Sequence, residues 1–196
     1  MPVSDRPMEI IHSRKAWRTW LAKNHQSQSS VWVVCNTQKS NKPTVAWTEL
    51  VDEALCFGWI DSTRKTIDET KFKQLFSKRK PRSTWSKINK EKIKRLTAEG
   101  LMMDAGFQAV KLAKQNGSWT ILDEVEKLAI PADLEKAFTL HPGAKDYFMS
   151  LSKSIKKMML QWIVLAKKPE TRNARLQQTV RMAEANRKPG LKGFQL

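Results

Sequence analysis

The sequence predicts an α+β fold, in which a small antiparallel sheet with packed helices is followed by an all-helical C-terminal region. Two observations predict this fold. Apolar and polar residues alternate with a period of two after Trp59, whereas only helical spacing is found past Trp119. We therefore place an α+β domain at residues 1–120 and a helical region at residues 121–196.

The composition is that of a globular protein with a substantial core. Hydrophobic residues make up 40% of the 196 residues, and eight residues are tryptophan. No run of about 18 apolar residues is present, so we expect no transmembrane segment. The first residues, MPVSDRPMEII, carry acids and prolines where a signal peptide has a basic and then an apolar region. We therefore expect a cytoplasmic protein.

The cysteine and histidine residues predict no metal site. Cys35 and Cys56 lie in apolar runs and do not form a CxxC pair, which favours two buried, reduced thiols. The chain has three histidines, at positions 12, 25 and 141, which are too few and too scattered for a structural zinc site. We expect no metal and no cofactor.

The first domain begins with an irregular segment, residues 1–12, in which two prolines limit regular structure. Ser13 is a suitable N-cap for a helix over about residues 14–24. The run VWVVC at residues 31–35 is β-branched and aromatic, which is typical of a buried strand. Residues 39–43 are expected to form a loop.

A second helix is expected to begin at residues 44–47 and to end before Gly58, which is free to take a positive φ. Its apolar face follows the spacing of three and four, with Leu50, Val51, Ala54 and Leu55. Asp52 and Glu53 are adjacent and therefore about 100° apart around the helix. We interpret them as solvated or ion-paired and not as a catalytic pair.

A two-stranded antiparallel hairpin follows. Alternating residues from Trp59 to Ile67 lead to a turn at residues 68–70, and residues 72–76 alternate on the return. With the strand at residues 31–35, the hairpin predicts a sheet of about three strands.

Pro81 interrupts the basic segment that follows the hairpin, so a helix begins only after it, with Ser83 or Ser86 as its cap. This helix runs to about Glu99, and another begins at Asp104. The residues expected to face inward are Trp85, Ile88, Leu96 and the stem of Lys92 in the first helix, and Phe107, Val110 and Ala113 in the second.

Helix starts are also readable in the C-terminal region. One helix begins at Pro131, a long amphipathic helix is capped by Ser152, and the last is opened by Pro169. The tail from Lys188 onward contains two glycines and a proline and is expected to be loose.

The formal net charge of +17 is concentrated in two segments. Residues 62–95 hold 13 basic and 3 acidic side chains, and residues 152–196 hold 11 and 2. Such segments favour binding of a polyanion, because cations displace the counterions of a phosphate backbone. A solubilising surface is the alternative interpretation.

Several strings resemble the YdeI/OmpD-associated family, whose members are labelled bacteriocin-protection proteins. They are EALCFGWID at 53–61, KRKPRSTWSKIN at 78–89, EGLMMDAGFQAVKLAKQNGSW at 99–119, and the helical segment at 150–188. The resemblance runs from about Trp17 to Lys188. It implies a link to envelope or toxin stress tolerance, and it supplies no catalytic residues.

The first functional hypothesis is a non-enzymatic protein that binds an anionic ligand. Guanidinium groups, a helix N-terminus and indole rings together suit a phosphate or a carboxylate. The candidate residues are Trp59, Asp61, Arg79, Arg82, Trp85, Ser86, Lys87 and Asn89. In the alternative interpretation, Asp61 pairs with Arg79 or Arg82, and both tryptophans belong to the core.

Two further hypotheses remain open. A nucleic-acid-binding protein would use the basic side chains of Lys78, Lys80, Lys90, Lys94 and Arg95, although no known nucleic-acid-binding signature is present. An enzyme would need Cys56 or Ser86 as nucleophile. Neither residue lies in a catalytic motif or has a histidine nearby in the sequence.

Overall fold

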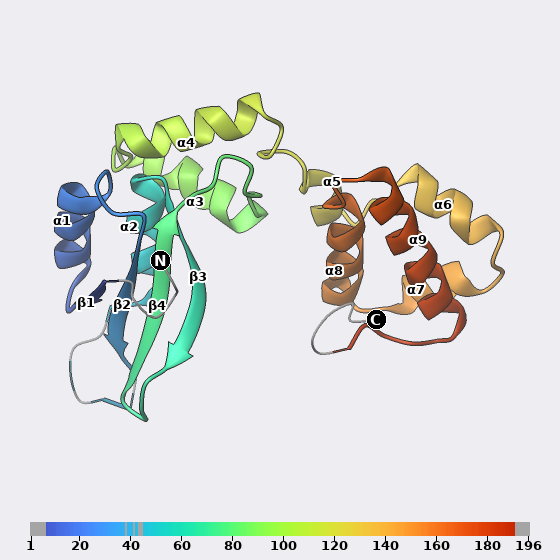
Figure 1. The fold of residues 1–196 in the computed structure, drawn as a ribbon, viewed down its shortest axis with the longest axis horizontal. Coiled ribbons are helices and arrows are strands. Elements are labelled where there is room, and N and C mark those ends of the chain that lie inside the picture. Colours follow the sequence, from blue (N-terminus) through green and yellow to red (C-terminus); the bar gives the residue numbers. More distant parts are fainter. Residues whose placement is uncertain (1–6, 38, 41, 43–44, 191–196) are drawn as a thin grey trace. The chain divides into compact units, whose positions relative to one another are not determined.

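The chain divides into two units, Met1–Trp119 and Thr120–Leu196. The structure, a computed structural model, describes residues 7–190 except residues 38, 41, 43 and 44. Within these residues all strands belong to the first unit, and the second unit contains helices without a sheet (Figure 1). The predicted α+β class is confirmed.

The first unit is built around a four-stranded sheet of order β1-β2-β4-β3 (Figure 1). β1 is parallel to β2, whereas β2–β4 and β4–β3 are antiparallel, so the sheet is mixed. Its elements in chain order are β1 (Met8–Ile10), α1 (Arg14–Asn24), β2 (Ser30–Asn36), α2 (Trp47–Cys56), β3 (Trp59–Thr66), β4 (Lys71–Lys78), α3 (Lys87–Ala98) and α4 (Asp104–Gln115).

The strand β1 corrects the expectation of an irregular segment over residues 1–12 and of a three-stranded sheet. Met8 lies opposite Trp32 in the parallel pairing with β2. The Pro7 carbonyl accepts a hydrogen bond from the Trp32 amide at 2.8 Å. A proline is tolerated here because β1 is an edge strand. Residues 1–6, residues 41, 43 and 44 of the predicted loop and helix start, and residues 191–196 of the predicted loose tail lie outside the described residues.

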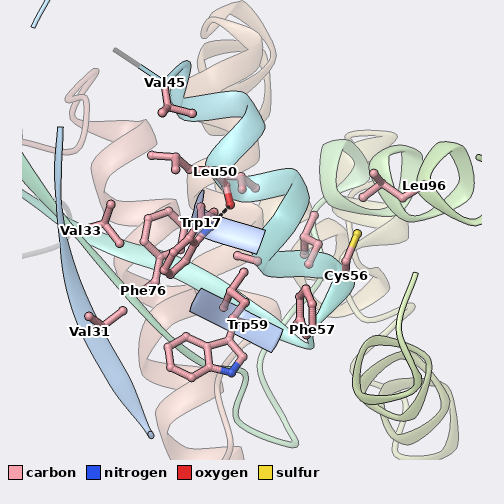
Figure 2. Close-up of a cluster of buried hydrophobic side chains, with 14 of the residues drawn as sticks. Trp17, Val31, Val33, Val45, Leu50, Cys56, Phe57, Trp59, Phe76 and Leu96 are labelled. Carbon is pink, nitrogen blue, oxygen red and sulfur yellow. Dashed lines mark hydrogen bonds between the residues drawn. The ribbon is translucent and has the colours of Figure 1, made fainter. Parts of the chain in front are cut away.

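The core of the first unit lies between the sheet and helices α1 and α2. Trp17 of α1 packs against Phe76 of β4, with ring centroids 5.1 Å apart, and both side chains are fully buried. Figure 2 shows the Trp17 indole donating a hydrogen bond to the Leu50 carbonyl of α2, and this bond measures 3.0 Å. The bond satisfies the polar atom of a ring that is otherwise surrounded by apolar side chains.

Helix α3 begins where predicted, but it faces the core differently. The Ser86 hydroxyl accepts a hydrogen bond from the Asn89 amide and is the N-cap. Ile93 and Leu96 are buried, whereas Ile88 is 65% exposed, so its predicted inward position was wrong. Phe107 of α4 is likewise 44% exposed. In each helix, fewer of the apolar residues are buried than their helical spacing predicted.

The second unit has its own core, centred on Leu134, Phe148, Met159 and Ile163. The Ser152 hydroxyl caps the long helix by accepting a hydrogen bond from the Ile155 amide, as predicted. The helices are α5 (Asp123–Glu126), α6 (Ala132–Thr139), α7 (Ala144–Ser150), α8 (Lys153–Val164) and α9 (Pro169–Glu184). Within the described residues of both units, we find no helix with the length and apolar character needed to cross a membrane.

Candidate functional site

A cavity of about 640 Å³ in the first unit is the strongest candidate site. Its walls come from segments that are far apart in the sequence. They are the turn after α1 (His25, Gln26), the α2–β3 junction (Phe57, Gly58, Trp59), the end of β4 (Lys78, Arg79) and the start of α4 (Met103, Asp104, Ala105, Gln108, Ala109). This volume suits a small organic molecule.

Close packing between the end of α2 and the start of α4 forms one side of this cavity. The Met103 amide donates a hydrogen bond to the Cys56 carbonyl at 3.1 Å, so α4 satisfies a carbonyl that α2 leaves open at its end. A Cβ atom on Gly106 would lie 2.3 Å from that carbonyl oxygen. Gly58 has a φ of 70°, and a Cβ there would lie 2.8 Å from the Ala105 carbonyl oxygen. Glycine at both positions allows the two backbones to touch.

Arg79 is the most unusual side chain in the cavity wall. Its guanidinium lies over the Trp85 ring, 3.6 Å from the centroid, and Nη2 donates to the Thr84 carbonyl. Burial lowers the pKa of Arg79 to about 10, and the charge of Asp61 opposes this shift. Nε and Nη1 are buried and have no hydrogen-bond acceptor among the described residues. The site therefore holds a desolvated cation with unused donors.

Asp61 does not neutralise this cation directly. Its Oδ2 accepts a hydrogen bond from the Trp47 indole at 3.2 Å, and the described residues contain no ion pair of Asp61 with Arg79 or Arg82 within 4 Å. Burial raises the pKa of Asp61, while the Trp47 bond and the charge of Arg79 lower it. Asp61 is not among the residues that line the cavity, whereas Trp59 is.

The remaining predicted ligand-binding residues also lie outside the cavity lining. Trp85 is 2% exposed and packs under Arg79 and against Trp119, which leaves it no free face for a ligand. Ser86 and Asn89 form the N-cap of α3. Lys87 and Arg82 are exposed. Of the eight predicted residues, the structure brings Trp59 and Arg79 to the cavity.

Most of the predicted nucleic-acid candidates contact other parts of the first unit. The Lys78 ammonium lines the cavity and donates to the Gln26 carbonyl at 2.7 Å. Arg95 bonds to Asp52 and Glu99, and Lys90 lies 5.4 Å from the Trp119 ring centroid. Lys80 and Lys94 are exposed.

Four polar lining residues were missed by sequence reasoning: His25, Gln26, Asp104 and Gln108. The first two follow α1, and the last two lie in the first turns of α4. No local motif marks them. They become neighbours of Arg79 only through the tertiary contacts of the helices.

Neither candidate nucleophile, Cys56 or Ser86, is placed to react with a substrate. The Cys56 side chain is fully buried, and burial raises the pKa of its thiol to about 11. The Ser86 hydroxyl accepts the capping hydrogen bond of α3. The described residues also contain no cluster of three or more His, Cys, Asp or Glu side chains suited to a metal ion.

We expect both cysteines to resist thiol reagents in the folded protein. Burial also raises the pKa of the Cys35 thiol to about 11, so at about pH 8 very little of either thiol is ionised. Ellman's reagent should titrate two thiols per chain after denaturation and almost none before it. Rapid reaction of one thiol in the native protein, with an unchanged circular dichroism spectrum, would contradict this burial.

Two family models match the chain. The model described as Domain of unknown function (DUF8412) matches residues 10–109, just over half of the chain, and the model described as Bacteriocin-protection, YdeI or OmpD-Associated matches residues 127–186. The chain belongs to the DUF8412 family and carries a YdeI/OmpD-associated domain. No curated protein and no solved structure matches it.

The match at residues 127–186 confirms the resemblance to the YdeI/OmpD-associated family. The strings at 53–61 and 78–89, which carried part of that resemblance, lie in the DUF8412 domain. The same domain contains every residue that lines the cavity. The cavity is therefore a feature of the DUF8412 domain.

Proposed function

We propose that the DUF8412 domain binds a small molecule with a carboxylate or phosphate group in the cavity beside Arg79. The observation that carries this proposal is the guanidinium of Arg79, which is desolvated and keeps two nitrogen donors without acceptors among the described residues. Lys78 adds a second cation to the same wall, and the buried side chains of Phe57 and Trp59 form the apolar packing behind it.

Two guanidinium nitrogens of the buried Arg79 lack hydrogen-bond acceptors among the described residues. A charged group removed from water is unfavourable unless a counter-ion and hydrogen-bond acceptors replace its hydration. The Trp85 ring, which lies under the Arg79 guanidinium, replaces part of the lost hydration. The charge of Asp61 stabilises the guanidinium only at longer range. An anion would supply both charge and acceptors, and a small movement of the side chain would expose its unused donors to the ligand. Charge-assisted hydrogen bonds of this kind are among the strongest in proteins.

Binding is favoured over catalysis because no lining residue has the arrangement of a nucleophile and its base. Asp104 also lines the cavity, and its carboxylate disfavours a second anionic group at that end. A ligand with one anionic end and one uncharged or cationic end suits this distribution best.

We expect Arg79→Met to weaken anion binding strongly while leaving the fold intact. The substitution removes the charge and the donors but keeps an apolar side chain over Trp85, so the free energy of unfolding should change by less than about 1 kcal/mol. Titration with inorganic phosphate, sulfate and succinate, followed by tryptophan fluorescence, should show at least a tenfold weaker affinity, about 1.4 kcal/mol.

The matched control is Arg82→Met, which removes an exposed arginine of the same basic segment that does not line the cavity. We expect it to bind the same anions as the unchanged protein. Equal losses in both variants would show general surface electrostatics and would contradict the assignment to Arg79. The proposal would also be contradicted if the unchanged protein bound none of the three anions.

We also propose that this binding serves tolerance of envelope or toxin stress in the cytoplasm. The support is the description of the family that matches residues 127–186, which includes bacteriocin protection. Cells that produce the Arg79→Met variant should survive bacteriocin exposure less well than cells with the Arg82→Met variant. Equal survival would contradict a role of the cavity in tolerance.

A further inference from the structure

The second unit contains a groove of about 600 Å³ along α8 and α9, which is separate from the cavity of the first unit. Its apolar lining consists of Met158, Trp162 and Leu165, and its basic lining of Lys157 and Arg175. Met158 is 37% exposed, and the other two apolar side chains are partly buried against the core. The groove thus joins an apolar floor to cations within one helix pair.

Contacts within the unit hold both cations at this groove. The Arg175 guanidinium lies 5.0 Å from the centroid of the Trp162 ring, and its Nη1 donates to the Trp162 carbonyl. The Lys157 ammonium lies 2.6 Å from a carboxylate oxygen of Glu126. A guanidinium has five N–H donors and an ammonium three, so each cation has the capacity to bond to an incoming acid as well.

The two helices that form the groove are rich in basic residues, although Glu126 of α5 pairs with Lys157. Residues 152–190, which include both helices, contain ten basic and two acidic side chains. This excess of basic side chains on the helix pair favours a ligand that is acidic in its outer parts. The apolar floor requires in addition an apolar group that leaves water on binding.

We propose that the α8–α9 groove docks a segment of a partner protein in which acidic residues flank an apolar anchor. The anchor contacts Met158 and Leu165, and the flanking carboxylates pair with Lys157 and Arg175. Methionine suits such a surface because its flexible side chain adapts to different apolar groups. A nucleic acid is favoured less, because its backbone offers charge without an apolar anchor and its binding requires a longer row of cations.

Fluorescence anisotropy of labelled probes tests the chemistry of the partner with the full-length protein at about 0.15 M salt. The probes are a peptide with leucines flanked by glutamates, the same peptide with serines in place of the leucines, and a single-stranded DNA of similar charge. We expect the leucine peptide to bind at least about tenfold more tightly than the serine peptide and the DNA. Equal affinity for the two peptides, or tighter binding of the DNA, would overturn the proposal.

A pair of methionine variants tests the location. Met158→Glu places a negative charge in the groove, whereas Met149→Glu places it at a methionine of α7 that is 51% exposed and outside the groove lining. We expect the leucine peptide to bind about tenfold or more weakly to the first variant and within about threefold of normal to the second. Should Met158→Glu not fold, Arg175→Gln gives the second variant. Equal effects inside and outside the groove would overturn the assignment.

Discussion

Replacing Gly58 with alanine should lower the free energy of unfolding of the first unit by about 2–4 kcal/mol. Two costs add at this position. The φ of 70° is unfavourable for any residue with a Cβ, and the new Cβ would lie 2.8 Å from the Ala105 carbonyl oxygen and 3.2 Å from the Ala109 Cβ. The carbonyl belongs to the backbone of α4, which cannot move without disturbing its contact with Cys56.

Urea denaturation followed by tryptophan fluorescence measures this effect, because seven of the eight tryptophans lie in the first unit. Gly100→Ala is the matched control. Gly100 also has a positive φ, 68°, but no atom lies within 4 Å of the position of its Cβ. Only the backbone cost of about 1–2 kcal/mol should appear there. If both variants lost the same stability, the close approach of α2 and α4 would contribute nothing to the fold.

The features that the sequence predicted best are those determined within a few residues. Ser13 and Ser152 were expected as N-caps, and the hydroxyl of each accepts the capping hydrogen bond. Between Ser83 and Ser86 the sequence left the cap open, and the structure assigns it to Ser86. A cap depends on one side chain and the first turn of its helix, so local chemistry is sufficient to identify it.

Features that depend on tertiary partners were predicted less well. Ile88 and Phe107 are apolar residues at helical spacing, yet each lies on a helix face that no neighbour in the unit covers fully. Apolar spacing shows which residues of a helix can be buried. Which of these residues are in fact buried depends on the elements that pack against the helix. β1 was missed for a related reason, because three residues carry too little pattern to indicate a strand.

The residues of the candidate site were likewise predicted where their chemistry is local and missed where tertiary packing positions them. Trp59 and Arg79 were nominated because an indole and a guanidinium are suited to binding an anion, and both line the cavity. Trp85 was nominated on equal grounds, but Arg79 covers its ring. His25 and Gln108 were not nominated, because only the packing of α1 and α4 near the β3–β4 hairpin brings them to one cavity.

Asp52 and Glu53 show how two adjacent residues, about 100° apart around a helix, take different structural roles. They were interpreted as solvated or ion-paired, and the structure shows them buried and ion-paired. Because they point in different directions around α2, each reaches a different neighbour. Asp52 bonds to Lys92 and Arg95 of α3, whereas Glu53 bonds to Arg14 and Arg18 of α1.

Glu53→Gln should therefore lower the free energy of unfolding of the first unit by about 2–3 kcal/mol. The Glu53 carboxylate is 2% exposed, and each of its two oxygens lies 2.6 Å from an arginine nitrogen. The neutral amide removes both charge pairings and turns one acceptor into a donor that faces the arginines. Because the two arginine side chains are 35% and 31% exposed, water screens part of the loss, and the expected value lies below that of a fully buried pair.

Glu91→Gln is the control in the same unit and in the same assay. Its pair with Lys87 spans 3.9 Å between side chains that are 63% and 69% exposed, so we expect a change of less than about 0.5 kcal/mol. A double-mutant cycle with Arg18→Met then isolates the coupling between Arg18 and Glu53, which should exceed about 1 kcal/mol. A Glu53→Gln variant as stable as Glu91→Gln would mean that apolar packing alone, including that of Trp17, holds α1 against α2.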